Sequence, residues 1–181
     1  MSGDAKTGYA ASCRLRPPRP ADARPLAELH VLAWQRAYRR LVPDGFLDGL
    51  SVERRAARWR EEIRDEADKI LVAEDGEGIA GFVRLGACRD EGAGPAAGEI
   101  HGIYLHPRAW RRGLGRRLCG EALARLAAAG FTEITLWVLR GNAQAIAFYE
   151  AMGFAADGRE REHRTRGGVV LPHARYRLRR D

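Results

Sequence analysis

The stretch from Leu105 to Arg116, LHPRAWRRGLGR, constrains the fold more than any other, because it combines a strand end, a tight loop and a helix start with four arginines. Glycine lacks a Cβ, so a phosphate can approach the backbone at Gly113 and Gly115. The first N–H groups of the following helix have no intrahelical partner and attract anions. The segment therefore predicts an anion-binding loop.

This loop matches neither of two common nucleotide-binding patterns. It lacks the Lys-Ser/Thr ending of a Walker A sequence, and Leu118 stands where a dinucleotide-binding G-x-G-x-x-G needs its third glycine. Taken alone, the segment is also compatible with a glycine-rich surface turn, which stays open as the alternative.

A second informative segment is Asn142–Phe154, NAQAIAFYEAMGF. Asn142 suits the N-cap of a short helix, and Gly153 suits the position after its end. Tyr149 shares the apolar face of this helix by the three-and-four spacing. Its side chain is thus either a core residue or a functional hydroxyl at the edge of the core.

Taken together, the two segments resemble the GCN5-related N-acetyltransferase (GNAT) superfamily, whose members use acetyl-coenzyme A (acetyl-CoA). The resemblance covers Ile100–Phe154 closely and the rest loosely, including an opening similar to R-P-A-x-x-A-D at Arg16–Asp22. It departs at Trp110, where the family usually has Gln or Arg. The resemblance implies an α/β GNAT fold, with a central mixed, largely antiparallel twisted sheet flanked by helices and with splayed central parallel strands.

Length and composition predict one domain over residues 13–181, which the resemblance implies is a GNAT acetyltransferase domain, after a disordered N-terminal tail over residues 1–12. No apolar run reaches the roughly twenty residues of a membrane span, and no signal-peptide core is visible. We therefore expect a cytoplasmic protein with no membrane partner. The three cysteines lack C-x-x-C spacing and a neighbouring His cluster, so neither a disulfide framework nor a metal site is expected.

The charge balance is basic, with 31 Lys and Arg against 24 Asp and Glu. Such a balance suits a polyanion, either a phosphate-bearing cofactor or a nucleic acid. Nucleic acid is not expected, because the chain has no helix-turn-helix signature and no aromatic-rich RNA-binding strand. A basic nucleic-acid-binding module and a non-catalytic CoA-binding domain stay as alternatives from other functional classes.

Hydrophobic periodicity and turn residues predict alternating strands and helices. Hairpins are expected across Asp75–Gly78 and Arg164–Gly168. The expected strands are Cys13–Arg16, Lys69–Glu74, Ile79–Cys88, Glu99–Leu105, Thr132–Leu139, Phe154–Glu162 and Val169–Leu178. The expected helices are a long one from Asp22 to about Arg40, then Gly45–Leu50, Ser51–Asp65, Gly113–Ala129 and one that Asn142 opens, with Asp22 and Ser51 as candidate caps.

The resemblance implies where acetyl-CoA binds, with its pyrophosphate on Arg111–Arg116 and its pantetheine arm along Ile103–Leu105. Leu105 N–H is the candidate donor to the thioester oxygen. Asn142 caps its helix and can touch the pantetheine arm, with capping alone as the alternative. The implied cofactor-binding residues are Ile103, Tyr104, Leu105, Arg111, Arg112, Gly113, Leu114, Gly115, Arg116, Asn142 and Phe148.

Acetyl transfer to an amine needs a neutral nitrogen, a polarised thioester carbonyl and a proton for the departing thiolate. The resemblance assigns the proton donor to Tyr149. Two candidate bases, Glu99 and His101, project from one face of their strand by the period of two. Glu99 is favoured because many relatives carry an acid there, and an idle strand-end carboxylate is the alternative.

The acceptor is the least constrained part. Trp34 and Tyr38 lie four apart on one helix face, which fits core packing or an aromatic substrate wall. A primary amine of a small molecule, attacking acetyl-CoA directly in a ternary complex, is the default expectation. A protein or peptide acceptor is the alternative, although Trp137 stands where some protein-alanine acetyltransferases have Glu. A homodimer also stays open.

Overall fold

The computed structural model describes residues 4–165 and 168–179. Its elements follow the predicted order, with the one addition of an N-terminal helix. The helices are α1 (Asp4–Ser12), α2 (Ala23–Ala37), α3 (Asp44–Asp48), α4 (Val52–Glu66), α5 (Leu114–Ala128) and α6 (Ala143–Glu150). The strands are β1 (Arg14–Arg16), β2 (Ile70–Asp75), β3 (Gly78–Ala87), β4 (Ala97–Leu105), β5 (Glu133–Leu139), β6 (Ala155–Arg164) and β7 (Val170–Arg179).

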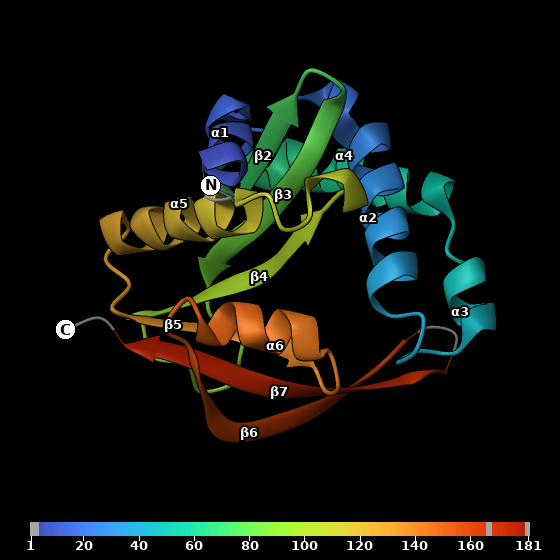
Figure 1. Ribbon diagram of the computed structural model, residues 1–181. Coiled ribbons are helices and arrows are strands. Elements are labelled where there is room, and N and C mark those ends of the chain that lie inside the picture. The colour runs from blue at the N-terminus through green and yellow to red at the C-terminus, as the bar shows by residue number, and fades with distance from the viewer. Residues whose placement is uncertain (1–3, 166–167, 180–181) are drawn as a thin grey trace.

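The strands form one sheet in the order β1-β2-β3-β4-β5-β7-β6. β4 and β5 run parallel, and the other described neighbours pair antiparallel. The parallel ladder joins Ala97–Ile100 to Glu133–Leu136 and then ends. Beyond it the two strands diverge (Figure 1). The expected mixed, largely antiparallel sheet with splayed central strands is confirmed.

A β-bulge interrupts β4 where the parallel ladder ends. Leu85 of β3 pairs with Ile100 and Arg84 pairs with Gly102, which leaves His101 as the extra residue. Because of the bulge, Ile100 and Ile103 pack into the same core although they are three positions apart, an offset that places side chains on opposite faces of a regular strand. A Cβ on Gly102 would lie 2.7 Å from the Tyr104 ring, so only glycine fits there.

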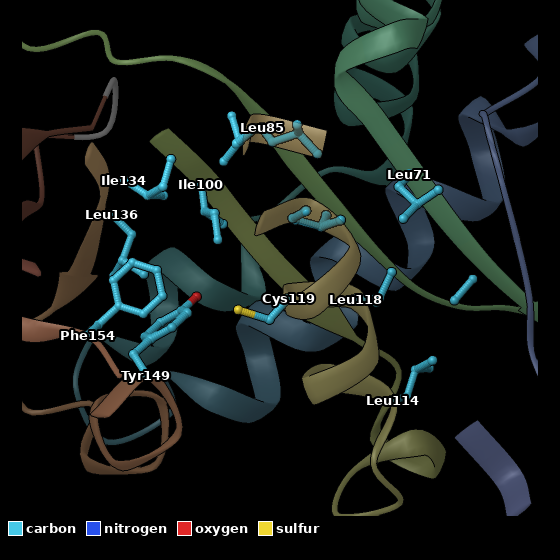
Figure 2. Close-up of a cluster of buried hydrophobic side chains, with 14 of the residues drawn as sticks. Leu71, Leu85, Ile100, Leu114, Leu118, Cys119, Ile134, Leu136, Tyr149 and Phe154 are labelled. Carbon is cyan, nitrogen blue, oxygen red and sulfur yellow. The ribbon is translucent and has the colours of Figure 1, made fainter. Parts of the chain in front are cut away.

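Helices cover both faces of the sheet (Figure 1). On one face, α5 and α6 pack over a core that includes Leu118, Cys119 and Tyr149 (Figure 2). On the other face, α2 and α4 bury Trp59 against Phe82 of β3. These helices form where predicted because their apolar residues recur at helical spacing, and the Ser51 hydroxyl caps α4 by accepting from Arg54 N–H.

The N-terminal segment corrects the expectation of a disordered tail. Asp4–Ser12 forms α1, which lies beside α5 in Figure 1. The Tyr9 hydroxyl donates to Asp75 Oδ2 at 2.6 Å, and the Arg117 guanidinium donates to the carbonyls of Ala10 and Cys13. The prediction of disorder is wrong for this helix, because distant polar partners hold a segment of low hydrophobicity. Residues 1–3 lie outside the described residues.

The start of α2 also differs in detail. Asp22 precedes the helix, but its side chain does not cap it. The carboxylate instead accepts from the Arg16 guanidinium at 2.6 and 3.0 Å and from Arg19 N–H at 2.6 Å. α2 then ends at Ala37 rather than near Arg40, because the N–H groups of the following residues turn back onto the Tyr38 carbonyl.

Candidate active site

A cavity of about 720 Å³ opens where β4 and β5 diverge. It extends from the loop before α5, along the free edge of β4, to the walls formed by α2, α6, β6 and β7. The sequence-predicted residues that line it are His101, Ile103, Tyr104, Leu105, Arg111, Gly113, Gly115, Arg116, Asn142, Phe148, Tyr149, Trp34 and Tyr38. Glu99, Arg112 and Leu114 are the predicted residues that do not line it.

The anion-binding loop has the backbone that its glycines predict. Gly113 adopts a φ of +84° as the residue before α5, and no side chain caps that helix end. The first N–H groups of α5 are therefore free to bind an anion. Arg111 is the one described non-glycine residue with positive φ, at +58°, and Arg111 and Arg116 bring two guanidinium groups to the cavity wall.

Two residues of the predicted cofactor site, Arg112 and Leu114, have side chains that contact other parts of the protein instead of the cavity. The Arg112 guanidinium lies over the Tyr9 ring, 3.5 Å from its centroid, on the side of α1. Leu114 is fully buried in the core between α5 and the sheet. The structure therefore separates these two side chains from the residues expected to contact the cofactor. Arg112 packs on Tyr9 of α1, and Leu114 packs in the core.

Trp110, the departure from the family pattern, has a clear structural role. Its indole N–H donates to the Leu105 carbonyl at 3.1 Å, and its side chain lines the cavity. A carbonyl at the free edge of β4 is thereby satisfied by the loop itself. The tryptophan braces the loop against the strand, which a Gln or Arg would do by different bonds.

The free edge of β4 presents backbone donors to the cavity. His106 N–H donates to Ala80 of β3 at 2.9 Å, and successive N–H groups of a strand point to opposite sides. The N–H groups of Leu105 and Ile103 therefore point away from β3, toward the space that β5 leaves open. An extended polar chain can bind along this edge as an additional strand would.

Tyr149 reaches the cavity from α6 and is only 8% exposed. Its hydroxyl points toward the sulfur of Cys119 on α5 (Figure 2). Burial, and then the neighbouring Cys119, raise the pKa of the phenol above its ordinary value, so Tyr149 stays protonated at neutral pH. Burial also raises the pKa of the Cys119 thiol to about 12, which keeps that side chain a thiol rather than a nucleophilic thiolate.

Asn142 begins α6 as predicted. Its side-chain oxygen accepts from Ala145 N–H at 3.2 Å, and the residue also lines the cavity. The cap orients the first turn of the helix that carries Tyr149. Capping is thus established for Asn142, and a contact with a cofactor stays a prediction.

The two candidate bases have different surroundings. Glu99 is 1% exposed and lies outside the cavity wall, where its carboxylate binds Arg89 through N–H, Nε and Nη2 at 3.0, 3.4 and 2.6 Å. Burial opposes the ionisation of Glu99, but the hydrogen bonds from Arg89 outweigh burial and lower the pKa of the carboxyl group. Glu99 is therefore a fixed carboxylate, paired rather than free to accept a proton.

His101 lines the cavity beside the bulge. Burial and the nearby Arg89 charge lower its pKa, so the imidazole is neutral at pH 7. Its Nε2 lies 3.3 Å from the Ala87 carbonyl, which requires a hydrogen on Nε2 and leaves the lone pair on Nδ1. Of the two predicted bases, His101 is the one that lines the cavity, and its Nδ1 is not used by the bond to Ala87.

Trp34 of α2 and Tyr38, the residue after that helix, take both roles that the sequence left open, core packing and cavity wall. Their rings meet edge to face with centroids 4.9 Å apart and pack on a small core with Leu139 and Leu171. Both side chains also line the cavity. They are packed residues whose outer surfaces form its aromatic wall.

The sequence analysis did not single out several lining residues, among them Trp110, Trp137, Gln144, Arg161 and His173. Arg161 and His173 lie on β6 and β7, outside the two diagnostic segments. Trp137 is the first β5 residue after the parallel ladder, so the predicted splay was the signal that could have found it.

Comparison with known proteins is decisive for the family. A family model described as the acetyltransferase (GNAT) family matches residues 34–154. The chain belongs to the GNAT acetyltransferase family. This GNAT protein is similar to the uncharacterized N-acetyltransferase YuaI of Bacillus subtilis, with 30% identity over 131 residues that cover 72% of this chain and 73% of YuaI.

A second relative is the probable N-acetyltransferase Rv2775 of Mycobacterium tuberculosis, with 28% identity over 93% of this chain and 94% of the relative. Among solved structures, PaiA N-acetyltransferase from Thermoplasma acidophilum, in complex with coenzyme A, superposes with a TM-score of 0.70. It is 21% identical, and the match covers 90% of this chain and 98% of PaiA. Fold and family together identify an N-acetyltransferase. Within the described residues, no helix combines the length and the apolarity that crossing a bilayer requires.

Proposed function

We propose that this GNAT enzyme transfers the acetyl group of acetyl-CoA to a primary amine of a small molecule, by direct attack in a ternary complex. The observation that carries the proposal is one cavity that joins an uncapped helix end with two arginines, a free strand edge and a protonated tyrosine. These features match, in order, the diphosphate, the amide-bearing arm and the sulfur of acetyl-CoA.

The diphosphate binds the free N–H groups at the start of α5, with Arg111 and Arg116 adding charge-assisted bonds. The pantetheine arm extends along β4, where Ile103 and Leu105 offer their N–H groups. One of these donors meets the thioester oxygen, and Leu105 is the candidate from the sequence. A hydrogen bond to this oxygen stabilises the negative charge that develops as the amine adds to the carbonyl carbon.

The reaction forms an N–C bond and breaks the C–S bond, so one proton leaves nitrogen and one reaches sulfur. Tyr149 donates the proton to the departing thiolate, which its raised pKa permits because the phenol is protonated before transfer. The tyrosine recovers its proton from solvent after the products leave. The proposal thus places the cofactor sulfur and the Tyr149 hydroxyl next to each other in the cavity.

We assign the base to His101 rather than to Glu99. The lone pair on Nδ1 of a neutral imidazole can take the proton of the amine, directly or through one water. Glu99 acts behind it by holding Arg89, whose charge lowers the His101 pKa. Glu99 is therefore a positioning residue in this proposal.

Aromatic walls support a small acceptor. Three rings, those of Trp34 on α2, Tyr38 just after α2 and Trp137 on β5, line the side of the cavity away from the diphosphate loop. These rings restrict the width available to an acceptor, which favours a free amine over the terminus of a folded protein.

The test is to incubate the protein with acetyl-CoA and a panel of small amines, with short peptides as a second arm, while released thiol is monitored. The proposal expects amine-dependent thiol release and an N-acetylated product by mass spectrometry. Acetylation confined to peptides would replace the small-molecule acceptor with a peptide. Binding of acetyl-CoA without thiol release under any condition would contradict acetyl transfer.

A further inference from the structure

The charges around the acceptor end of the cavity have one sign. Among the described residues that line the cavity, none is Asp or Glu, and Arg161 places a positive charge at the end away from the loop, beside the uncharged imidazole of His101. An acceptor recognised by its ammonium group alone would need a carboxylate there. The cavity offers the opposite charge.

Arg161 lies on β6, and its side chain is held by residues of two other segments. Its guanidinium lies over the Trp137 ring, 4.1 Å from the centroid, and Nη1 is 3.6 Å from Asp90 Oδ1. The stacking fixes the plane of the guanidinium at the fork where β4 and β5 diverge, because Trp137 is the first residue beyond the parallel ladder.

The charge of Arg161 is only partly neutralised. Asp90 already accepts from Arg175 at 2.8 Å and from the Trp137 indole N–H at 2.9 Å, both shorter than its 3.6 Å approach to Arg161. Arg175 in turn is paired with Asp157 as well. Burial lowers the Arg161 pKa despite the nearby carboxylates. The guanidinium therefore gains from an additional anion.

The diphosphate of acetyl-CoA is too far away to be that anion. From His101 at the fork to Leu105 before the loop, β4 rises four residues, or about 13 Å at 3.3 Å per residue. Arg111 and Arg116 serve the loop end. Arg161 stands at the other end, beside Trp137 at the fork, where it can reach an acceptor but not the diphosphate.

A second donor awaits a ligand across the cavity. The indole N–H of Trp34 is buried and makes no well-formed hydrogen bond to any described residue. The nearby Tyr104 hydroxyl interacts with this N–H, but without the geometry of a full hydrogen bond. A buried donor without a partner is costly unless a bound molecule satisfies it.

We propose that Arg161 binds a carboxylate or phosphate of the acceptor, so that the preferred substrate is a small primary amine that also carries an anionic group. This inference rests on the proposed acetyl transfer for the reaction itself, and on the cavity alone for binding. Trp137 and Asp90 position the guanidinium. Cationic polyamines are disfavoured, because they meet like charge at this end.

The test compares matched acceptors in the thiol-release assay. One arm sets α-amino acids with side chains from small to aromatic against their amides and their decarboxylated amines. The other arm sets phosphoethanolamine against ethanolamine, which separates a phosphate from a carboxylate as the recognised group. We expect the anionic member of at least one set to have a kcat/KM at least tenfold higher than its neutral or cationic counterparts. Equal or better use of the uncharged members would overturn the inference.

The variant Arg161→Gln should raise KM for the anionic acceptor at least tenfold, with kcat changed less, and should erase the preference. Arg161→Lys should restore part of it, because the charge returns without the planar fork. The matched control is Arg159→Gln, which removes an exposed arginine of the same strand that does not line the cavity. A preference that persists in Arg161→Gln contradicts the assignment.

A binding arm separates this inference from the reaction. Calorimetry on the CoA-loaded protein, with desamino carboxylic acids as unreactive probes, measures anion binding without acetyl transfer. Binding to the wild type that is lost in Arg161→Gln supports the site even where no amine reacts, in which case only the proposed reaction fails. Absence of binding by every acid and by phosphate esters overturns the site, whatever the enzyme acetylates.

Discussion

The guanidinium of Arg112 lies 3.5 Å from the centroid of the Tyr9 ring. One arginine of the anion-binding loop therefore packs against the N-terminal helix α1. The same tyrosine donates to Asp75, which is also bound by Arg108. Two consecutive arginines of similar sequence context therefore have different roles. Arg111 faces the cavity, and Arg112 ties the loop to α1.

This difference predicts unequal effects on cofactor binding. Arg111→Gln should weaken CoA affinity on the order of tenfold, because a charge-assisted bond to the diphosphate is lost. Arg112→Gln should change that affinity less than about threefold but lower stability slightly through the lost Tyr9 contact. Calorimetric titration of both variants with CoA measures the difference. Equal losses would mean that Arg112 leaves Tyr9 for the cofactor.

The proton-donor role of Tyr149 predicts a loss confined to turnover. Tyr149→Phe should lower kcat on the order of tenfold to a thousandfold, with CoA affinity nearly unchanged. The matched control is Tyr176→Phe, which alters another buried tyrosine of the same core outside the cavity. Steady-state kinetics beside CoA titration provide the readout, and unchanged turnover in Tyr149→Phe would refute the role.

The lowered His101 pKa predicts the acid side of the pH–rate profile. Since the folded pKa lies below 6.5, the imidazole is neutral at pH 7 and becomes protonated only as the pH falls below its pKa. kcat should therefore decline below about pH 6.5. His101→Gln should lower kcat by about a hundredfold and remove this decline. A profile of the variant with the same acid limb would assign it to another group.

Asp75 predicts part of the stability at low pH. Burial opposes its ionisation, but Arg108, Tyr9 and the Glu77 N–H outweigh burial and lower its pKa from 3.8 to about 2. Its contribution is thus complete above pH 4 and is lost as the pH falls toward 2, with a size on the order of 2 kcal/mol. Urea unfolding at pH 7 and pH 2.5 should show a smaller acid loss in Asp75→Asn than in the wild type. The exposed pair of Arg64 and Asp65 supplies the control variant Asp65→Asn, which should leave the acid loss intact.

Asn142→Ala separates a cap from a cofactor contact. Loss of the bond to Ala145 N–H should lower the free energy of unfolding by about 1 kcal/mol. If the residue also touches pantetheine, CoA affinity should fall in addition. Normal affinity in the destabilised variant would restrict Asn142 to capping.

Local signals explain what the sequence predicts well. The turn residues at Asp75–Gly78, the Ser51 cap and the glycine loop before α5 each act within a few residues, so their structures follow from the local sequence. The splay of β4 and β5 followed from the family resemblance. Of the candidate site, the sequence therefore predicted the anion-binding loop and the position of Tyr149 on the helix that Asn142 opens.

Long-range partners explain the rest. α1 is held by Asp75, which is 66 positions from its partner Tyr9, and by Arg117, which is 107 positions from its partner Ala10. Local periodicity cannot predict such contacts. Glu99 and His101 are two residues apart on β4, yet only the position of Arg89 decides that the carboxylate is paired and that the pKa of the imidazole is lowered. Arg161 and His173 reach the cavity through the pairing of β5 with β7 and of β6 with β7.

The most direct test of the central claim is a calorimetric titration of the purified protein with CoA and with acetyl-CoA. Binding of the diphosphate at the start of α5 predicts saturable association of one molecule per chain with either ligand, weakened by Arg111→Gln and insensitive to Tyr149→Phe. The absence of association with both ligands would contradict the account at its foundation.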